Sequence, residues 1–159
     1  MSQQHTLNRP IESTPDDSLL GKATLYPESY QPDLLFPIPR QPNREKLPVP
    51  LDRVALGVDW WHVFEVSWLS ATGKPMVAIA RLAFPANSPC IIESKSLKLY
   101  FNSLNFKTFD SAVALADLIV SDLSPVAGAK VGCDILPVDA LLPVSIQQLQ
   151  PSSLCLDGF

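Results

Sequence analysis

Alternating hydrophobic and polar positions predict two neighbouring strands in the middle of the chain. The first runs from Asp59 to Leu69 (DWWHVFEVSWL) and the second from Met76 to Phe84 (MVAIARLAF). The turn-rich segment SATGKP joins them, which indicates a β-hairpin. Because side chains of a regular strand point alternately to its two faces, we expect one face of the first strand to carry five residues. These are Trp60, His62, Phe64, Val66 and Trp68.

Two helical patterns follow the hairpin. In the first, Leu97, Tyr100, Phe101 and Leu104 have the i, i+3, i+4, i+7 spacing of an amphipathic helix. A second helix is predicted over residues 111–123, with a hydrophobic stripe along one side. The polar face of the first helix consists of Lys95, Lys98, Asn102 and Asn105, and the stripe of the second of Ala112, Leu115, Ala116, Ile119 and Leu123.

The ends of the second helix and a third strand complete the pattern. Asp110 is the candidate cap at the start of the second helix, and Gly128 is expected to close it. From Lys130 to Val138 the residues alternate again, with Val131, Cys133 and Ile135 on the inner face. The order strand, strand, helix, helix, strand predicts an α+β fold, in which an antiparallel sheet carries two helices on one face.

Prolines set the first third of the chain apart from the rest. Nine of the 16 prolines fall within the first 50 residues. Because proline fixes φ and lacks an N–H donor, we expect an extended arm here, and neither a helix nor the interior of a sheet. We expect residues 1–17 to be disordered, residues 18–56 to wrap against a folded surface through their hydrophobic side chains, and residues 57–159 to form the folded module.

Composition and charge narrow the classes of function. With 159 residues, 47% hydrophobic and 18% charged, the chain is expected to form one soluble globular domain. A net charge of −4 argues against a nucleic-acid surface. No hydrophobic run is long enough for a membrane span and no secretion signal begins the chain, so we expect a cytoplasmic location. The spacing of Cys90, Cys133 and Cys155 indicates neither a disulfide framework nor a structural zinc site.

Candidate chemistry gathers where the first helix begins. Ser94 or Ser96 is expected to cap that helix and to leave N–H groups directed outward, with Lys95 adding positive charge. Such a helix start suits a phosphate group. The neighbouring carboxylate of Glu93 could accept paired N–H donors from a guanine-like heterocycle. An ordinary capped helix with a solvated lysine face is the alternative interpretation.

A resemblance to a known family favours the first interpretation. The run ESKSLKLY, residues 93–100, resembles the signature E-[SL]-K-[SA]-x-K-x-[YFW] of the NADPH-dependent 7-cyano-7-deazaguanine reductases of queuosine biosynthesis, the QueF family. From about residue 19 onward, the chain resembles the first half of the two-module form of that nitrile reductase. Four further segments carry this likeness: LLGKATLYPESY (19–30), GVDWWHVFEVSWL (57–69), LIVSDLS (118–124) and LCLD (154–157).

The resemblance implies a fold, ligands and partners. It implies a tunnelling fold (T-fold), which pairs modules side by side so that ligands lie at their interfaces, and a homodimer of the intact enzyme. It also implies that Ile92, Glu93 and Ser94 face the substrate 7-cyano-7-deazaguanine, while Ser94 and Lys95 contact NADPH. The nitrile would be reduced to 7-aminomethyl-7-deazaguanine, an intermediate of tRNA modification. Neither nucleic acid nor a membrane is expected as a direct partner.

The chain lacks the pair of catalytic runs, one following the other, of the family it resembles. Nitrile reduction needs a thiolate nucleophile and a proton donor, which family members supply from S-N-C and Q-P-D runs in the second module. No S-N-C run occurs in this sequence, and its one Q-P-D run, residues 31–33, lies in the proline-rich arm with no S-N-C run before it. Cys155 with Asp157 resembles linker sequence instead, so we expect no catalytic residue in this chain and no turnover by it alone. The remaining cysteines, Cys90 and Cys133, are expected to pack in the interior.

Two other interpretations stay open. A non-catalytic module that binds a purine or a pterin would need the same fold and the same carboxylate. A metal-dependent cyclohydrolase is disfavoured because the sequence has no cluster of cysteine and histidine ligands. His62 is interpreted as a packed or hydrogen-bonded histidine rather than a catalytic one. Asp59 and Glu65, carboxylates within a hydrophobic strand, each need a partner, and Glu65 could be either a structural anchor or a ligand group.

Overall fold

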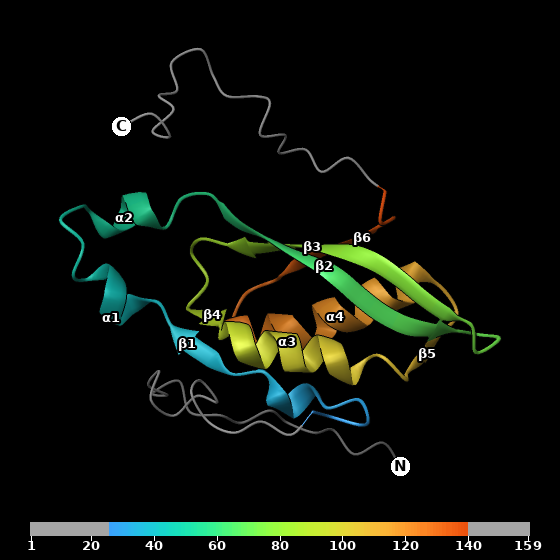
Figure 1. Cartoon of the computed structure of the whole chain (residues 1–159). Coiled ribbons are helices and arrows are strands. Elements are labelled where there is room, and N and C mark those ends of the chain that lie inside the picture. Colours follow the sequence, from blue (N-terminus) through green and yellow to red (C-terminus); the bar gives the residue numbers. More distant parts are fainter. Residues whose placement is uncertain (1–25, 140–159) are drawn as a thin grey trace, which may run out of the picture.

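A computed structural model describes residues 26–139 of the chain and has the α+β architecture expected from the sequence. Its main sheet contains four strands in the order β5-β2-β3-β6, and a separate pair is formed by β1 and β4. The two long helices, α3 (Ser94–Ser103) and α4 (Ala112–Ala127), lie together beneath the main sheet (Figure 1). The expected arrangement of two helices on one face is therefore confirmed.

The central hairpin is confirmed with longer strands than the sequence pattern predicted. β2 (Val58–Ser70) pairs antiparallel with β3 (Pro75–Pro85). Gly73 supplies a positive φ of 78° in the turn between them, a conformation that glycine adopts without steric cost. β6 (Gly132–Leu136) pairs antiparallel with β3, which confirms the third strand. The two-residue β5 (Thr108–Phe109) runs parallel to the end of β2 and gives the sheet one parallel pair.

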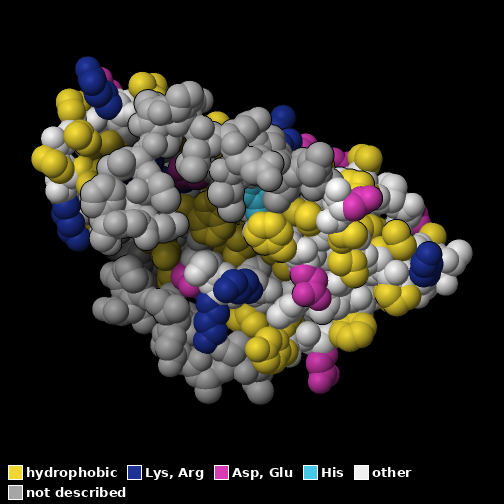
Figure 2. All heavy atoms as spheres, turned by 45° about the horizontal axis from the view of Figure 1, so that its top comes forward, with side chains coloured by type: hydrophobic (Ala, Val, Ile, Leu, Met, Phe, Trp, Pro, Cys, Tyr) yellow, Lys and Arg dark blue, Asp and Glu magenta, His cyan; other side chains and the backbone are white. Residues whose placement is uncertain are grey.

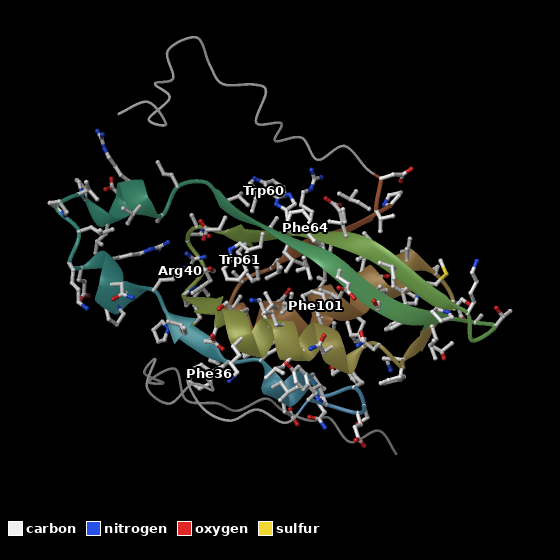
Figure 3. All side chains as sticks on the ribbon, viewed as in Figure 1. Phe36, Arg40, Trp60, Trp61, Phe64 and Phe101 are labelled. Carbon is white, nitrogen blue, oxygen red and sulfur yellow. The ribbon has the colours of Figure 1, made fainter. Side chains whose placement is uncertain are left out.

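A β-bulge in β2 overturns the expectation that five alternate residues share one face. Val63 pairs with Ala80 and Val66 with Ala78, so two residues of β2 lie opposite the single residue Ile79. The extra residue reverses the alternation. Val66 and Trp68 are buried, whereas Trp60 and Phe64 are exposed by 55% and 67%. Figure 3 shows Trp60 and Phe64 on the side of β2 away from the helices, and Trp61 on the side that faces them.

The ends of α4 are only partly as expected. Its N-cap is Ser111, whose hydroxyl accepts a hydrogen bond from the backbone N–H of Ala114 at 3.1 Å, so the prediction of Asp110 as the cap was wrong. Serine is as good a cap as aspartate, and the two residues are adjacent, so composition alone could not separate them. Gly128 ends the helix with φ at 71°, as predicted.

The proline-rich segment lies against the module of its own chain. It contains a 3₁₀ turn η2 (Pro32–Leu34), the strand β1 (Pro37–Pro39), and two single-turn helices, α1 (Gln41–Arg44) and α2 (Leu51–Val54). The expectation of an arm without helix was therefore wrong. Short helices form because proline is tolerated in the first turn, as at Pro42 in α1. Residues 1–25 and 140–159 lie outside the described part, and with them the predictions made for residues 1–17.

β1 is an edge strand whose composition limits further pairing. It runs antiparallel to β4 (Cys90–Ile92), with Pro37 opposite Ile92 and Pro39 opposite Cys90. Glu93 N–H donates to the Phe36 carbonyl at 2.9 Å, and Arg40 N–H donates to the Pro89 carbonyl at 3.0 Å. Since inward and outward amides alternate along an antiparallel strand, the two prolines occupy positions whose amides would point away from β4.

The hydrophobic core lies between the main sheet and the two long helices. It includes Val66, Leu82 and Phe84 from the sheet, Tyr100 from α3, and Ile119 from α4. The opposite sheet face carries exposed hydrophobic side chains, seen in yellow in Figure 2. Within residues 26–139, no helix combines the length and hydrophobicity needed to cross a membrane.

Candidate functional site

Glu93 joins β4 to α3 and forms the centre of the candidate site. It is the N-cap of α3 and is only 4% exposed. Its Oε1 accepts the backbone N–H of Lys95 at 2.8 Å, and its Oε2 accepts that of Ser96 at 2.7 Å. The carboxylate therefore lies against the positive end of the helix dipole and satisfies two amides that would otherwise lack helical partners.

This geometry corrects the expectation that Ser94 or Ser96 caps the helix and leaves outward N–H groups. The amides of Lys95 and Ser96 are taken by Glu93, so these two donors are not available to a phosphate. The Ser96 hydroxyl does not cap the helix and instead bonds to backbone groups of the β4–α3 junction and the arm. It donates to the Glu93 carbonyl at 2.7 Å and accepts the Phe36 N–H at 3.1 Å, which ties the arm to the start of α3.

The four predicted ligand residues are consecutive and differ in accessibility. Ile92 and Glu93 are buried, Ser94 is exposed, and Lys95 is of intermediate exposure. The Ser94 hydroxyl lies 3.5 Å from Glu93 Oε1. Sequence reasoning missed the contribution of the arm to this site. The proline-rich composition gave no sign that Phe36 would contact Glu93 and Ser96 through its backbone.

The described cysteines are poor candidates for a nucleophile. Burial raises the pKa of the Cys90 thiol, and the nearby Arg40 guanidinium offsets this only in part. Burial raises the pKa of the Cys133 thiol to about 12, with a further contribution from the Asp134 carboxylate. Because the thiolate is the reactive form, both thiols are weaker nucleophiles at neutral pH than an unperturbed cysteine would be. Cys155 and Asp157 lie outside the described residues.

The polar residues of β2 have three different environments. Asp59 forms an ion pair with Arg40, with 2.5 Å between Oδ2 and Nη2. Glu65 is exposed at the bulge, where water solvates its carboxylate, so it needs no partner within the sheet. His62 stacks on Phe64 with ring centroids 6.0 Å apart, and its Nε2 is buried without a hydrogen-bond partner. His62 is thus packed, as expected, but its Nε2 lacks a hydrogen-bond partner.

The described residues offer no obvious metal site. Across residues 26–139, no three side chains of histidine, cysteine, aspartate or glutamate gather closely enough to hold an ion. Arg81 and Asp134, the other ion pair of this region, cross the outer face of the sheet beside Trp60. The Arg81 guanidinium lies 5.1 Å from the centroid of that indole ring.

Comparison with known proteins agrees with the motif. The family described as "Nitrile reductase, 7-cyano-7-deazaguanine-reductase N-term" matches residues 26–135. A protein of Acinetobacter baumannii named NADPH-dependent 7-cyano-7-deazaguanine reductase is 53% identical over 142 residues, which cover 89% of this chain. Proteins with the same name from Acinetobacter baylyi and Chromohalobacter salexigens are 51% and 50% identical, over 142 and 137 residues, covering 89% and 83% of this chain.

These matches cover only part of the relatives. The aligned region is 50% of the two Acinetobacter proteins and 49% of the Chromohalobacter protein. The chain thus spans about half the length of the relatives it matches, and the family match names the N-terminal part of the nitrile reductases. On this evidence, the chain belongs to the family formed by the N-terminal part of the 7-cyano-7-deazaguanine nitrile reductases.

Proposed function

We propose that this chain is the N-terminal module of an NADPH-dependent reductase that converts 7-cyano-7-deazaguanine into 7-aminomethyl-7-deazaguanine. The observation that carries the proposal is the position of Glu93 within a chain of this family. A buried carboxylate is held by two backbone amides at the junction of β4 and α3, within the run ESKSLKLY that resembles the family signature. A fixed carboxylate of this kind suits recognition of a guanine-like edge, which presents paired N–H donors.

Capping and ligand binding can use different lone pairs of Glu93. A carboxylate has about four acceptor positions, and the helix amides occupy one on each oxygen. We infer that the remaining positions accept the heterocycle, with Ile92 and Ser94 completing the substrate contacts. Ser94, which is exposed, and Lys95 would contact NADPH. The ammonium group of Lys95 would then face a phosphate of the cofactor as a point charge.

The chemical step belongs to the half of the enzyme that this chain does not span. There a cysteine thiolate would attack the nitrile carbon to form a thioimide, and two molecules of NADPH would each supply one hydride. The carbon–sulfur bond would break between the two reductions to release the thiolate, and an aspartic acid would supply protons. We further infer a tunnelling fold that pairs the two modules, a homodimer of the intact enzyme and a cytoplasmic location. The exposed hydrophobic residues on the outer sheet face, such as Trp60 and Phe64, are consistent with pairing to another module.

Joining this chain to the C-terminal half of the Acinetobacter baumannii relative gives the direct test. The chimera should oxidise NADPH when 7-cyano-7-deazaguanine is added, whereas the 159-residue chain alone should not. Lys95→Ala in the chimera should raise the KM for NADPH at least tenfold while changing kcat less. Lys74→Ala, at the exposed hairpin turn, removes the same charge far along the strands and should leave both constants unchanged.

Two results would count against the proposal. An unchanged KM for NADPH in the Lys95→Ala chimera would remove Lys95 from the cofactor site. A folded chimera that binds 7-cyano-7-deazaguanine without oxidising NADPH would favour the other function that the site can support, a module that binds purines or pterins without converting them.

A further inference from the structure

A pocket separate from the Glu93 site lies where the arm meets the β3–β4 connection. Its volume is about 420 Å³, within the range of small-molecule sites. Arg40 and Arg44 contribute its charged side chains, while Pro39, Leu51 and Ala55 supply hydrophobic wall. It is at the Pro39–Pro89 end of the β1–β4 pair, whereas Glu93 pairs with Phe36 at the opposite end.

Arg40 is held rigidly at the edge of this pocket. Its Nε donates to the Ser88 hydroxyl at 3.1 Å, and its Nη2 donates to Asp59 at 2.5 Å. The side chain is only 11% exposed. Its Nη1 bonds to no described residue, yet among residues 26–139 the only buried polar side-chain atom without a partner is His62 Nε2. Arg40 is one of the residues that line the pocket, and Nη1 is its guanidinium nitrogen without a partner among the described residues. Figure 3 shows the side chain extending from the arm toward the sheet.

Arg44 gives the pocket its net positive charge. Its Nη2 donates to the Ala86 carbonyl at 2.5 Å, which fixes the guanidinium without neutralising it. The described residues form two ion pairs, Arg40 with Asp59 and Arg81 with Asp134, and neither involves Arg44. No aspartate or glutamate is among the described residues that line the pocket. An anion entering it would therefore meet one uncompensated guanidinium and a second one with a spare donor.

We infer that this pocket binds the phosphate of a nucleotide-sized ligand. Planar guanidinium groups match phosphate oxygens, and both are fixed here before any ligand arrives, which reduces the entropic cost of binding. The hydrophobic wall suits the ring of a base or sugar. The phosphate could belong to a free nucleotide or to the adenosine end of the proposed NADPH. Only the second source rests on the proposed function.

Titration of the 159-residue chain with 5′-AMP, 2′,5′-ADP and adenosine, followed by isothermal calorimetry, tests the inference. We expect 5′-AMP to bind at least tenfold more tightly than adenosine, because only the nucleotide carries a phosphate. Tenfold or greater preference for 2′,5′-ADP over 5′-AMP would identify the adenosine end of NADPH as the source. Equal affinity would show that the pocket does not recognise the 2′-phosphate that marks the adenosine end of NADPH, and would favour a free nucleotide.

Two variants and one control locate the binding. Arg44→Gln removes the uncompensated charge, and Ala55→Glu places a carboxylate on the wall without breaking any bond of the arginines. Each should weaken 5′-AMP binding at least tenfold. Arg53→Gln removes the same charge from an exposed residue of α2 that does not line the pocket, and should change affinity less than twofold.

The inference fails if 5′-AMP does not bind at millimolar concentration, if adenosine binds as tightly, or if Ala55→Glu retains wild-type affinity. Thermal unfolding establishes whether each variant is folded. If Arg44→Gln does not fold, the affinity of Ala55→Glu decides the test. Should nucleotide binding fail here while the chimera still oxidises NADPH, this inference alone is overturned and the proposed function stands.

Discussion

At the scale of single residues, Glu93 has a structural task that any functional test must separate from ligand binding. Its two oxygens accept the amides of Lys95 and Ser96, and it is almost fully buried. The sequence pointed to the right motif but to the wrong cap. Short side chains such as serine dominate helix N-caps, and nothing in the pattern indicated that a longer carboxylate would fold back over its own helix.

We expect Glu93→Ala to destabilise the chain by about 2 kcal/mol, because both amides lose their partner. Glu93→Gln keeps one oxygen acceptor of the same size but turns an NH₂ group toward the other amide, and should cost about 1 kcal/mol. Urea unfolding of the two variants and the wild type measures the difference. Equal stability of Glu93→Ala and wild type would show that the cap contributes nothing. The glutamine variant is accordingly the better choice for studying substrate recognition.

At the scale of elements, the bulge in β2 decides which residues reach the core. The two helices and three principal strands followed the periodicity of the sequence, because long hydrophobic patterns specify such elements well. The periodicity did not reveal the bulge, because the residues on either side of it alternate as in a regular strand. Read without the bulge, the sequence places Trp60 and Trp68 on the same face, although one is exposed by 55% and the other by 5%.

Deletion of single residues tests this register. Deleting Glu65 removes the extra residue, leaves Val63 and Val66 opposite their present partners, and should change the free energy of unfolding by no more than about 1 kcal/mol. Deleting Ser67 turns Trp68 toward solvent and should cost about 3 kcal/mol. Chemical denaturation followed by tryptophan fluorescence compares them. Equal losses from both deletions would contradict the register described here.

At the scale of the whole molecule, a buried hydrogen-bond cluster joins the arm to both long helices. Asp122 Oδ2 in α4 accepts the hydroxyl of Tyr30 from the arm at 2.8 Å and that of Tyr100 from α3 at 2.7 Å. Burial raises the pKa of Asp122, while the hydrogen bonds from Tyr100 and Tyr30 and the charge of Lys107 oppose the rise. The same burial and the nearby carboxylate raise the pKa of both tyrosines.

This cluster predicts a specific dependence of stability on pH. A carboxyl whose pKa is raised by folding binds its proton more tightly in the native state, so its contribution to stability declines as pH rises from 3.8 through the raised pKa. Asp122→Asn keeps an acceptor for the tyrosines but cannot titrate. The stability of wild type minus that of Asp122→Asn should therefore be larger at pH 4 than at pH 7, as measured by urea unfolding at both values.

Asp122→Ala provides the structural comparison. It leaves the buried hydroxyl of Tyr100 and the half-buried hydroxyl of Tyr30 without their acceptor and should cost about 2 kcal/mol or more at pH 7. A difference between wild type and Asp122→Asn that is constant or grows with pH would show that folding does not raise the pKa of Asp122.

The arm is also the part of the molecule that sequence reasoning described least well. Prolines indicated an extended segment, and the hydrophobic residues Leu35 and Phe36 indicated contact with a surface. In the structure both side chains are buried in the interior of their own chain. The contacts that fix the arm, Arg40 with Asp59 and Tyr30 with Asp122, join residues 19 and 92 positions apart. No local pattern encodes such pairs, since they depend on the completed fold.

The prolines of β1 have one more consequence, for how copies of the chain behave at high concentration. A strand at the rim of a sheet can recruit a foreign strand by offering it a row of donors and acceptors. Pro37 and Pro39 have no N–H donors, so the carbonyl groups of an added strand would find no hydrogen-bond partner at these two positions. One edge of β1 pairs with the strand that leads to Glu93, and the other edge is thus a poor template for amyloid-like growth.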